Sequence, residues 1–483
     1  MRPVHVRARL APTAAALLAS LLLGCGAEEE PRAPEGPAPP ALAETSLPTG
    51  RATIQVESSA LVPERTENPP VPLPLRLGDG NLAFGHVQAS TALGTWGAYD
   101  RAGSDGVFDI ALSTPGASAA SGEAPPSGQI TTAKASSRLV AERPTHQTSP
   151  SLAAGPAGRM WLAFEEGEAD WGRGANLRRA RKVVFGEVLP SGDFAPLEVP
   201  LTDAEAPSLC VDGLGRPWLF ARQLESWLPL GKEGQDGTAS NRRVAWTLSA
   251  SVLTAAGWSA PLVLPHSDGP EDGALELEAT AIGVRARYFT DQRRARIDDG
   301  QLSGPWDQTL SGAGAWFETR LSLDGGAAPE PTEKVADPTA ERDPKAPNAA
   351  PARALRGPLC LPTGARVLWG DLHRHTDASR CKMEEDGDLA DAYRYALGTA
   401  RLDFLAVTDH FQHMTPAVFE REVRTADAYD ALEGFVAFPG YERALPLGHW
   451  TMVAASEPGT ELVETAFQPF RPRHLWDDHD PAV

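Results

Sequence analysis

The sequence predicts a multidomain protein with an all-β, propeller-like N-terminal domain and an α/β C-terminal domain. Short strand patterns separated by turn residues fill residues 51–326 and contain an internal repeat. From residue 354 to 483, apolar runs alternate with helical patterns, as in a parallel α/β sheet. Residues 327–353 are rich in proline and mixed charge, without a hydrophobic period. We expect this segment to link the two domains.

Length, charge and cysteine content limit the class of protein. The chain has 483 residues, room for about three domains. It carries 44 Lys and Arg against 64 Asp and Glu, a formal charge of −20. Such a surface repels phosphates, so we expect no nucleic-acid partner. The four cysteines are too few for a disulfide scaffold, and their spacing contains no zinc-binding Cys-x-x-Cys pair.

Residues 1–24 have the pattern of an export signal. Three arginines precede an apolar stretch at residues 10–23, which has the length of a signal-peptide core and is too short to span a bilayer. The segment Leu22-Leu23-Gly24-Cys25 resembles a bacterial lipobox. That resemblance implies cleavage before Cys25 and lipidation of its sulfur, which would anchor the protein to a membrane. A plain secretory signal is the alternative.

Residues 25–50 are rich in Pro, Ala and Glu, a composition typical of a disordered tether. Gly26 follows Cys25, where an aspartate would favour retention in the inner membrane. We therefore expect an exported protein of the cell envelope, lipid-anchored in the outer membrane.

One repeat in the β region joins two strand patterns through a glycine turn. Pro150-Ser151-Leu152, Gly158-Arg159 and Trp161-Leu162 recur 57 residues later as Pro207-Ser208-Leu209, Gly215-Arg216 and Trp218-Leu219. Each copy predicts a hairpin. A second pair of similar segments, 188–194 and 252–258, has an offset of 64 residues.

Repeats of this length with four short strands are typical of propeller blades. The pattern resembles sialidase-like or kelch-like β-propellers, and an irregular β-sandwich is the alternative. His86, His146 and His266 are isolated in this region, so no catalytic constellation is evident there. We expect Cys210, within a strand pattern, to be a small core residue.

Histidines gather in the C-terminal domain, where seven of the eleven lie between His373 and His479. Helical stripes begin at Asp388 and at Thr415-Pro416, which suit N-terminal capping positions. Apolar runs predict strands at residues 367–369, 404–407, 435–441 and 450–455. The predicted order is βαβαββ, and the strand–helix–strand units predict parallel strands.

The ends of these strands carry residue types that bind metals. His373 and His375 are two residues apart, so on an extended strand both side chains project to one side. Asp409-His410 follows the second strand, Glu442 the third, and His449 begins the fourth. In parallel α/β folds, ligands gather at the carboxyl ends of strands. We therefore expect a metal centre formed by His373, His375, His410, Glu442 and His449.

Nitrogen and oxygen ligands of this kind suit zinc, manganese or iron. We expect two or three divalent ions, with Asp409 as the catalytic residue beside them. For Asp409 the alternatives are a ligand, a residue that orients a ligand, and a helix cap. Asp371 either orients a histidine or is a turn residue.

Three motifs, GDLHRHTDAS, LDFLAVTDH and FPGYE…GHW, resemble those of the polymerase and histidinol phosphatase (PHP) family. The resemblance covers residues 365–483. It implies a distorted seven-stranded β/α barrel with two or three metals, and hydrolysis of phosphoesters. It also implies that His373, His375, His410 and His449 are metal ligands and that Glu442 bridges two ions. Cys381 falls where some members place a further histidine, as a thiolate ligand or a loop residue.

The family's later ligands should come from strands beyond Val483. We therefore expect the chain to be a truncated piece of a longer protein, with only part of the barrel and an open core that would leave it inactive. Asp477-Asp478-His479 imitates a ligand motif but comes too early in the chain to supply one.

The sequence thus predicts an exported metal-dependent hydrolase, a phosphoesterase that uses metal-activated water. Its substrate class, small molecule or glycan, is open. The alternative is a cell-surface ligand- or glycan-binding lipoprotein with a vestigial PHP domain. A third hypothesis, a sialidase-like enzyme, needs clustered arginines and carboxylates in the β region, which sequence spacing does not reveal.

Overall fold

This computed structural model describes residues 52–62, 74–76, 82–91, 94–102, 108–113, 137–140, 145–156, 158–167, 181–227, 243–268, 275–290, 315–331, 359–360, 365–376, 378–379, 387–411, 416–432, 434–445 and 448–454. The predicted signal peptide, tether and lipidated Cys25 lie outside these ranges, as do most of the linker, Cys381 and His479. The domain boundaries and the membrane anchor stay predictions. Within the described ranges, no helix has the length and apolar content needed to cross a membrane.

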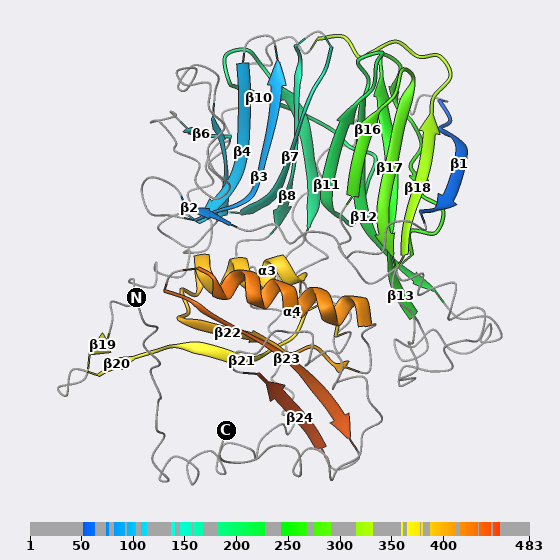
Figure 1. Cartoon of the computed structure of the whole chain (residues 1–483). Coiled ribbons are helices and arrows are strands. Elements are labelled where there is room, and N and C mark those ends of the chain that lie inside the picture. Colours follow the sequence, from blue (N-terminus) through cyan, green and yellow to red (C-terminus); the bar gives the residue numbers. More distant parts are fainter. Residues whose placement is uncertain are drawn as a thin grey trace, which may run out of the picture. The chain divides into compact units, whose positions relative to one another are not determined.

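Residues 55–322 form four consecutive antiparallel sheets, which we call the four-sheet region (Figure 1). Sheet 1 contains β2 (Leu75–Arg76), β3 (Leu82–Thr91), β4 (Gly94–Ala102), β5 (Phe108–Ser113) and β6 (Ser137–Leu139). Sheet 2 contains β7 (His146–Ala154), β8 (Met160–Gly167), β9 (Lys182–Val188) and β10 (Phe194–Leu197). Sheet 3 contains β11 (Ala204–Val211), β12 (Pro217–Trp227), β13 (Arg243–Thr254), β14 (Gly257–Trp258) and β15 (Leu262–Val263). Sheet 4 contains β16 (Leu275–Ala279), β17 (Gly283–Thr290), β18 (Ala315–Ser322) and β1 (Gln55–Leu61).

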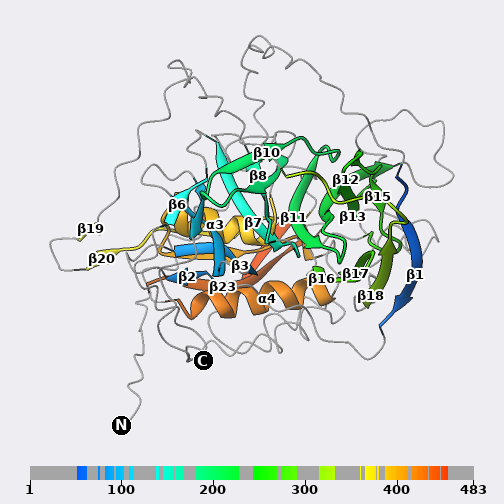
Figure 2. The ribbon, with the colours of Figure 1, turned by 90° about the horizontal axis from the view of Figure 1, so that it is seen from above.

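Strand β1 joins the beginning of this region to its end. It pairs antiparallel with β18, so that Gln55 lies opposite Ser322. Figures 1 and 2 both show the two strands side by side although they are far apart in the sequence. A sheet completed by strands from both ends of the region ties those ends together, as in propeller-like folds. The predicted all-β, propeller-like region is confirmed.

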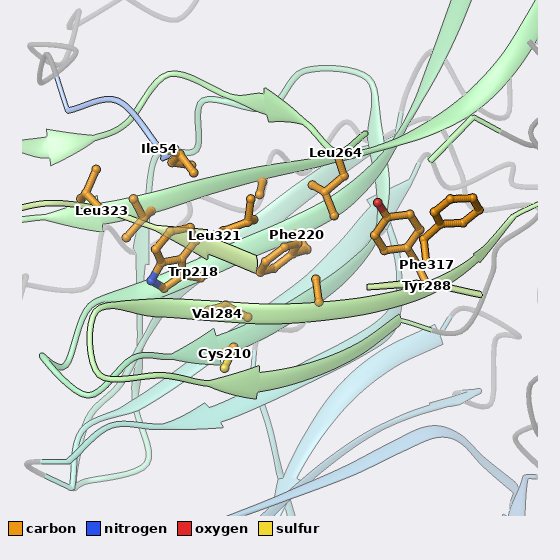
Figure 3. Packing of buried hydrophobic residues seen from close by; sticks show 13 residues of the cluster. Ile54, Cys210, Trp218, Phe220, Leu264, Val284, Tyr288, Phe317, Leu321 and Leu323 are labelled. Carbon is orange, nitrogen blue, oxygen red and sulfur yellow. The ribbon is translucent and has the colours of Figure 1, made fainter. Parts of the chain in front are cut away.

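Consecutive sheets pack face to face through apolar side chains. Trp161 and Phe185 of sheet 2 share a cluster with Leu219 of sheet 3. Trp218 and Phe220, on the other face of sheet 3, pack with Tyr288 of sheet 4 (Figure 3). A third cluster joins sheets 1 and 2. Cys210 is buried in the cluster of Figure 3, as predicted. The alternation of side chains along each strand therefore buries both faces of the middle sheets, which a two-sheet sandwich would not do.

The sequence repeat corresponds to two equivalent hairpins. Leu152 lies opposite Leu162 in β7–β8, and Leu209 lies opposite Leu219 in β11–β12. Both first strands contain an irregularity just before these pairs, where Ser149 (φ 53°) and Ala206 (φ 49°) adopt left-handed backbone conformations. Such irregularities bend and twist a strand, so the repeat gives sheets 2 and 3 the same curvature.

The arginines of the repeat hold the segment that follows β18. Arg216 is fully buried, is paired with Asp212 at 2.8 Å and donates a hydrogen bond to the Leu323 carbonyl at 3.0 Å. Arg159, its counterpart in sheet 2, pairs with Glu187 and donates to the Glu330 carbonyl at 3.2 Å. The repeat therefore secures the chain as it crosses from sheet 4 past sheets 3 and 2.

The C-terminal part, which we call the α/β unit, has one four-stranded sheet of order β21-β22-β23-β24. Its elements are β21 (Gly370–Arg374), α3 (Leu389–Arg394), the π-helix η1 (Tyr395–Thr399), β22 (Phe404–Val407), α4 (Pro416–Asp430), β23 (Val436–Leu445) and β24 (Gly448–Val453). The first three strands are parallel and β24 is antiparallel to β23. Strands β19 (Leu359–Cys360) and β20 (Arg366–Val367) form a separate pair.

The predicted PHP-type partial β/α barrel is wrong for the described residues. Strand β24 follows β23 directly, without a helix between them, and runs in the opposite direction. This ends the strand–helix alternation that curls a parallel sheet into a barrel. The order βαβαββ and the parallel first strands are as predicted.

The helices form where their capping residues predict. Asp388 caps α3, with its carboxylate accepting from the Asp391 N–H at 2.7 Å and the Asp391 carboxylate completing a capping box. Helix α4 begins at Pro416, and Phe419 and Val423 on its inner face are buried. Both helices lie on the same side of β22 and β23 (Figure 1).

The first predicted strand is displaced. Leu368 and Trp369 are exposed, not buried in the sheet, and β21 begins at Gly370. The preceding residues are drawn away because Val367 pairs with Leu359 in β20–β19. As a result, His373 lies within a strand and not in the loop that follows it.

We predict that Arg216→Met will lower the free energy of unfolding by about 3–5 kcal/mol. The substitution would leave the fully buried Asp212 carboxylate without its cationic partner. Denaturant unfolding measures the change. Arg320→Met is the matched control, because the Arg320 side chain is half exposed and its ion pair with Glu318 should contribute less than about 1 kcal/mol. Equal effects of the two substitutions would contradict the structural role of Arg216.

Candidate metal centre

The α/β unit brings all five predicted ligands together at one end of its sheet. His373 belongs to β21, His375 follows it, and His410 follows β22. Glu442 lies within β23 and His449 within β24. An isolated parallel bridge between His410 and Glu442 continues the pairing of β22 with β23. The sheet order therefore places residues separated by up to 76 positions in sequence in one cluster.

Glu442 is the centre of the cluster. Its Oε2 lies 2.9 Å from His373 Nε2, 2.7 Å from His375 Nε2 and 3.6 Å from His410 Nδ1. Its Oε1 contacts His449 Nδ1 without the geometry of a hydrogen bond. Four imidazoles from three segments thus converge on one carboxylate.

The cluster has a buried floor and open sides. The Glu442 side chain is 1% exposed and that of His410 is 8% exposed, whereas those of His373 and His449 are 52% and 55% exposed. Solvent and a small ligand can therefore reach the histidine nitrogens while the carboxylate stays fixed beneath them.

Burial and neighbouring charges set the protonation of the two inner residues. Burial lowers the pKa of His410 to about 4, although the Glu442 carboxylate acts in the opposite direction. Burial alone would raise the pKa of Glu442, but hydrogen bonds from His375 and His373 lower it to about 2. At neutral pH His410 is neutral and Glu442 is ionised, and these are the forms that bind cations.

These residues fit divalent metal ions. They form two groups that share Glu442, one with His373 and His375 and the other with His410 and His449. His373 Nε2 and His375 Nε2 are 3.1 Å apart, close to the spacing of about 3.3 Å between two ligands of a tetrahedral zinc ion. The buried Oε1 of Glu442 lacks a hydrogen-bond donor, which a cation would compensate. Two histidines and one carboxylate also leave coordination positions open for water or substrate.

Asp409, the predicted catalytic residue, belongs to neither group. It is fully buried and accepts hydrogen bonds from the backbone N–H of Thr376 at 2.6 Å and from the Thr376 hydroxyl. Burial raises its pKa, while hydrogen bonds to Glu422 and Thr376 act against this. In this structure Asp409 connects the segment after β21 to the end of β22. Its catalytic role stays a prediction.

Two hydroxyl residues that sequence reasoning missed hold the ligand segments. Thr376 binds Asp409, and the Ser379 hydroxyl accepts from the His410 backbone N–H at 2.8 Å. Asp371, within β21, accepts from the His373 backbone N–H at 2.9 Å, and its two predicted alternatives stay open. The only sequence signal for Thr376 and Ser379 was their position just after the His-x-His pair.

The arginine and carboxylate cluster required by the sialidase-like hypothesis does exist in the four-sheet region. Arg181 and Arg222 contact Glu165 and Glu205 there. However, all four side chains are buried, and Asp391 of helix α3 contacts Arg181 at 2.5 Å. The arginines of this cluster are therefore already paired with carboxylates of the same chain.

No family model matches the chain, and the search of curated proteins finds no match. Several solved structures resemble it over about half of its length. The GH43 endo-arabinanase from Bacillus licheniformis is 10% identical, with 50% of this chain and 73% of that chain covered and a TM-score of 0.25. A thermostable family-43 glycoside hydrolase is 10% identical, with 52% and 78% covered and a TM-score of 0.27. A protein of unknown function from Dyadobacter fermentans is 8% identical, with 56% and 99% covered and a TM-score of 0.24.

The resemblance to the PHP family is therefore corrected. No family model supports it, and several of the similar solved structures carry arabinanase or glycoside-hydrolase names. The phosphoesterase function that the resemblance implied is withdrawn with it. TM-scores of 0.27 and below assign neither an activity nor a ligand to this chain, so glycan binding stays a prediction.

We predict that Thr376→Val will lower the free energy of unfolding by about 1–3 kcal/mol, because it leaves the buried Asp409 carboxylate without one of its donors. Urea unfolding measures the change. Thr451→Val, on the exposed surface of β24, is the control and should have little effect. A T376V protein as stable as the wild type would contradict the contact described here.

Proposed function

We propose that the α/β unit binds divalent transition-metal ions through His373, His375, His410, Glu442 and His449. The observation that carries this proposal is the convergence of four imidazoles on the buried Glu442 carboxylate. Zinc, manganese and iron are the candidate ions, since the ligand set is nitrogen with one shared carboxylate. The two groups that share Glu442 support a pair of ions, the lower of the two numbers that the sequence suggests.

When bound, such ions act as Lewis acids and lower the pKa of water from about 15.7 towards 7. The protein's own residues would set the conditions for this chemistry. Glu442 would be shared by the ions as a buried ligand, and the exposed His373 and His449 would be ligands on the side that solvent and substrate can reach. Ser379 and Asp371 hold the backbone of two ligand histidines. We propose water activation at this site as the chemical function of the α/β unit, with the substrate class unassigned.

Metal content tests the proposal. We expect the chain without residues 1–24 to retain about two equivalents of zinc or manganese after dialysis. His373→Ala should remove about one equivalent, and Glu442→Gln should remove most of both, because Glu442 is shared by the two groups. Elemental analysis measures the content and circular dichroism checks the fold.

His86→Ala is the matched control, since His86 lies in β3 and packs against Tyr99, far in the sequence from the cluster. It should leave metal content unchanged. Equal metal loss in H86A and H373A, or no metal above background in the wild type, would sink the proposed site.

The second candidate is the alternative drawn from the sequence, ligand or glycan binding by the four-sheet region. Strand β1 completes sheet 4 of that region, and none of the five candidate ligands comes from its described residues. A binding role there would be independent of metal. On a glycan array, binding by the wild-type chain that is unchanged in Glu442→Gln would support this candidate, and absence of binding by both would reject it.

A further inference from the structure

Helix α3 is attached to the four-sheet region by ion pairs that water does not reach. Asp391 contacts Arg181 at 2.5 Å, and Arg394 contacts Asp100 of β4 at 2.8 Å. These four side chains are 6% exposed or less. Exposed ion pairs contribute little to stability, whereas buried ones depend on close packing. Three charged residues at this short helix contact separate parts of the four-sheet region in this way. The third is Asp388, which lies 4.0 Å from Arg222 of β12.

Apolar packing surrounds these ion pairs. Phe84 and Phe108 of sheet 1 share a cluster with Leu389 and Tyr393 of α3. Gly398 of η1 approaches so closely that a Cβ atom there would lie 2.3 Å from Phe108 Cζ. The contact is therefore fitted to this helix, within one compact unit of residues 47–483.

Two carboxylates of the four-sheet region, Glu165 and Glu205, contact the same arginine as Asp391. Glu165 of β8 contacts Arg181 at 3.3 Å, and Glu205 of β11 contacts the same arginine at 3.6 Å and also pairs with Arg222. Glu165 also accepts from the Ala206 backbone N–H and from the Thr148 hydroxyl.

The cluster has more acids than bases. Its acids are Asp100, Glu165, Glu205, Asp388 and Asp391, and its bases are Arg181, Arg222 and Arg394. With every group ionised, three positive and five negative charges give a net charge of −2 (3 − 5). Buried carboxylates that lie close together favour uptake of a proton.

Burial raises the pKa of Asp100 in this cluster, and Glu165 is the second carboxyl group that can take up a proton. Burial, together with the charges of Glu205 and Asp391, raises its pKa to about 7 despite the attraction of Arg181. Asp391 behaves differently, because although burial acts to raise its pKa, Arg181 and Arg394 lower it. The carboxylate on the helix therefore stays ionised while the one behind it titrates.

We propose that helix α3 is a pH-sensitive latch, which holds the α/β unit to sheets 1 to 3 and loosens when Glu165 ionises. Every element packed against Glu165 presents a charged or polar group to it. These are Thr148 on β7, Arg181 before β9, Glu205 and the Ala206 N–H on β11, and Asp391 on α3. Ionised Glu165 adds a third negative charge beside Arg181, after Glu205 and Asp391. The additional charge weakens the ion pair between Arg181 and Asp391.

The direction of the pH effect follows from the raised pKa. A released helix would remove Asp391 and part of the burial, so the pKa of Glu165 would fall towards its ordinary value of 4.5. Below that value the latch is at full strength, and it weakens as pH rises from about 4.5 to about 7. Above about pH 7 both states are ionised and the latch stays weak. One proton is linked to closing, so the ratio of latched to released molecules falls by up to about tenfold per pH unit in this window.

Hydrogen exchange of the full chain tests the latch. Protection of the α3 backbone amides, corrected for intrinsic exchange, should fall about tenfold or more between pH 5.5 and pH 7.5. Glu165→Gln, which mimics the protonated carboxyl, should keep high protection at both pH values. Glu166→Gln is the matched control, because Glu166 pairs with Lys182 outside the cluster, and it should behave as the wild type.

If E165Q folds poorly, Glu205→Gln replaces it. Removing the Glu205 charge should lower the pKa of Glu165 and move the loss of protection to lower pH. Protection of α3 that does not change with pH in the wild type, or an E165Q protein with the same pH dependence as the wild type, would overturn the proposal. Metal content is measured on the same samples, since the latch does not depend on the proposed metal function.

Discussion

The burial of one carboxylate constrains the α/β unit more than any other single feature. Glu442 is 1% exposed, and a charged group at that depth needs cations or hydrogen-bond donors around it. Its partners come from the ends of β21 and β22 and from β24. They reach it only because β21 and β22 run parallel to β23 while β24 runs antiparallel. The mixed sheet, which departs from a barrel, is therefore the arrangement that supplies both open sides and a fixed floor to the site.

The four-sheet region is held together mainly by apolar packing, because its middle sheets carry apolar side chains on both faces. Stacking buries Trp161, Trp218 and Tyr288 between successive sheets, and β1 ties the last sheet to the start of the region. A group of buried charges lies where Arg181 and Arg222 meet helix α3. The apolar layers give the region its order, and these buried charges determine how tightly the α/β unit is attached to it.

Local patterns predicted local structure well. The 57-residue repeat gave two hairpins, Asp388 capped α3 as expected, and the five candidate ligands came together because each lies at or beside the carboxyl end of its strand or on the adjacent strand. Long-range features were missed. Arg181 and Asp391 are 210 residues apart, and no local pattern links them. The start of β21 was misplaced because no sequence pattern showed that Val367, in the same apolar run, pairs with Leu359 of β19. The family assignment failed because short histidine motifs reflect the needs of a metal site and do not identify a fold.

Direct binding of metal by the imidazoles around Glu442 is the central proposal for this protein. X-ray absorption at the metal K-edge of the zinc-loaded chain measures this, because it reports the atoms bound to the ion and their distances. We predict nitrogen and oxygen ligands at about 2.0–2.1 Å with the scattering pattern of two or more imidazoles per ion and no sulfur. A spectrum of water ligands without imidazole, or of sulfur at about 2.3 Å, would contradict the site described here.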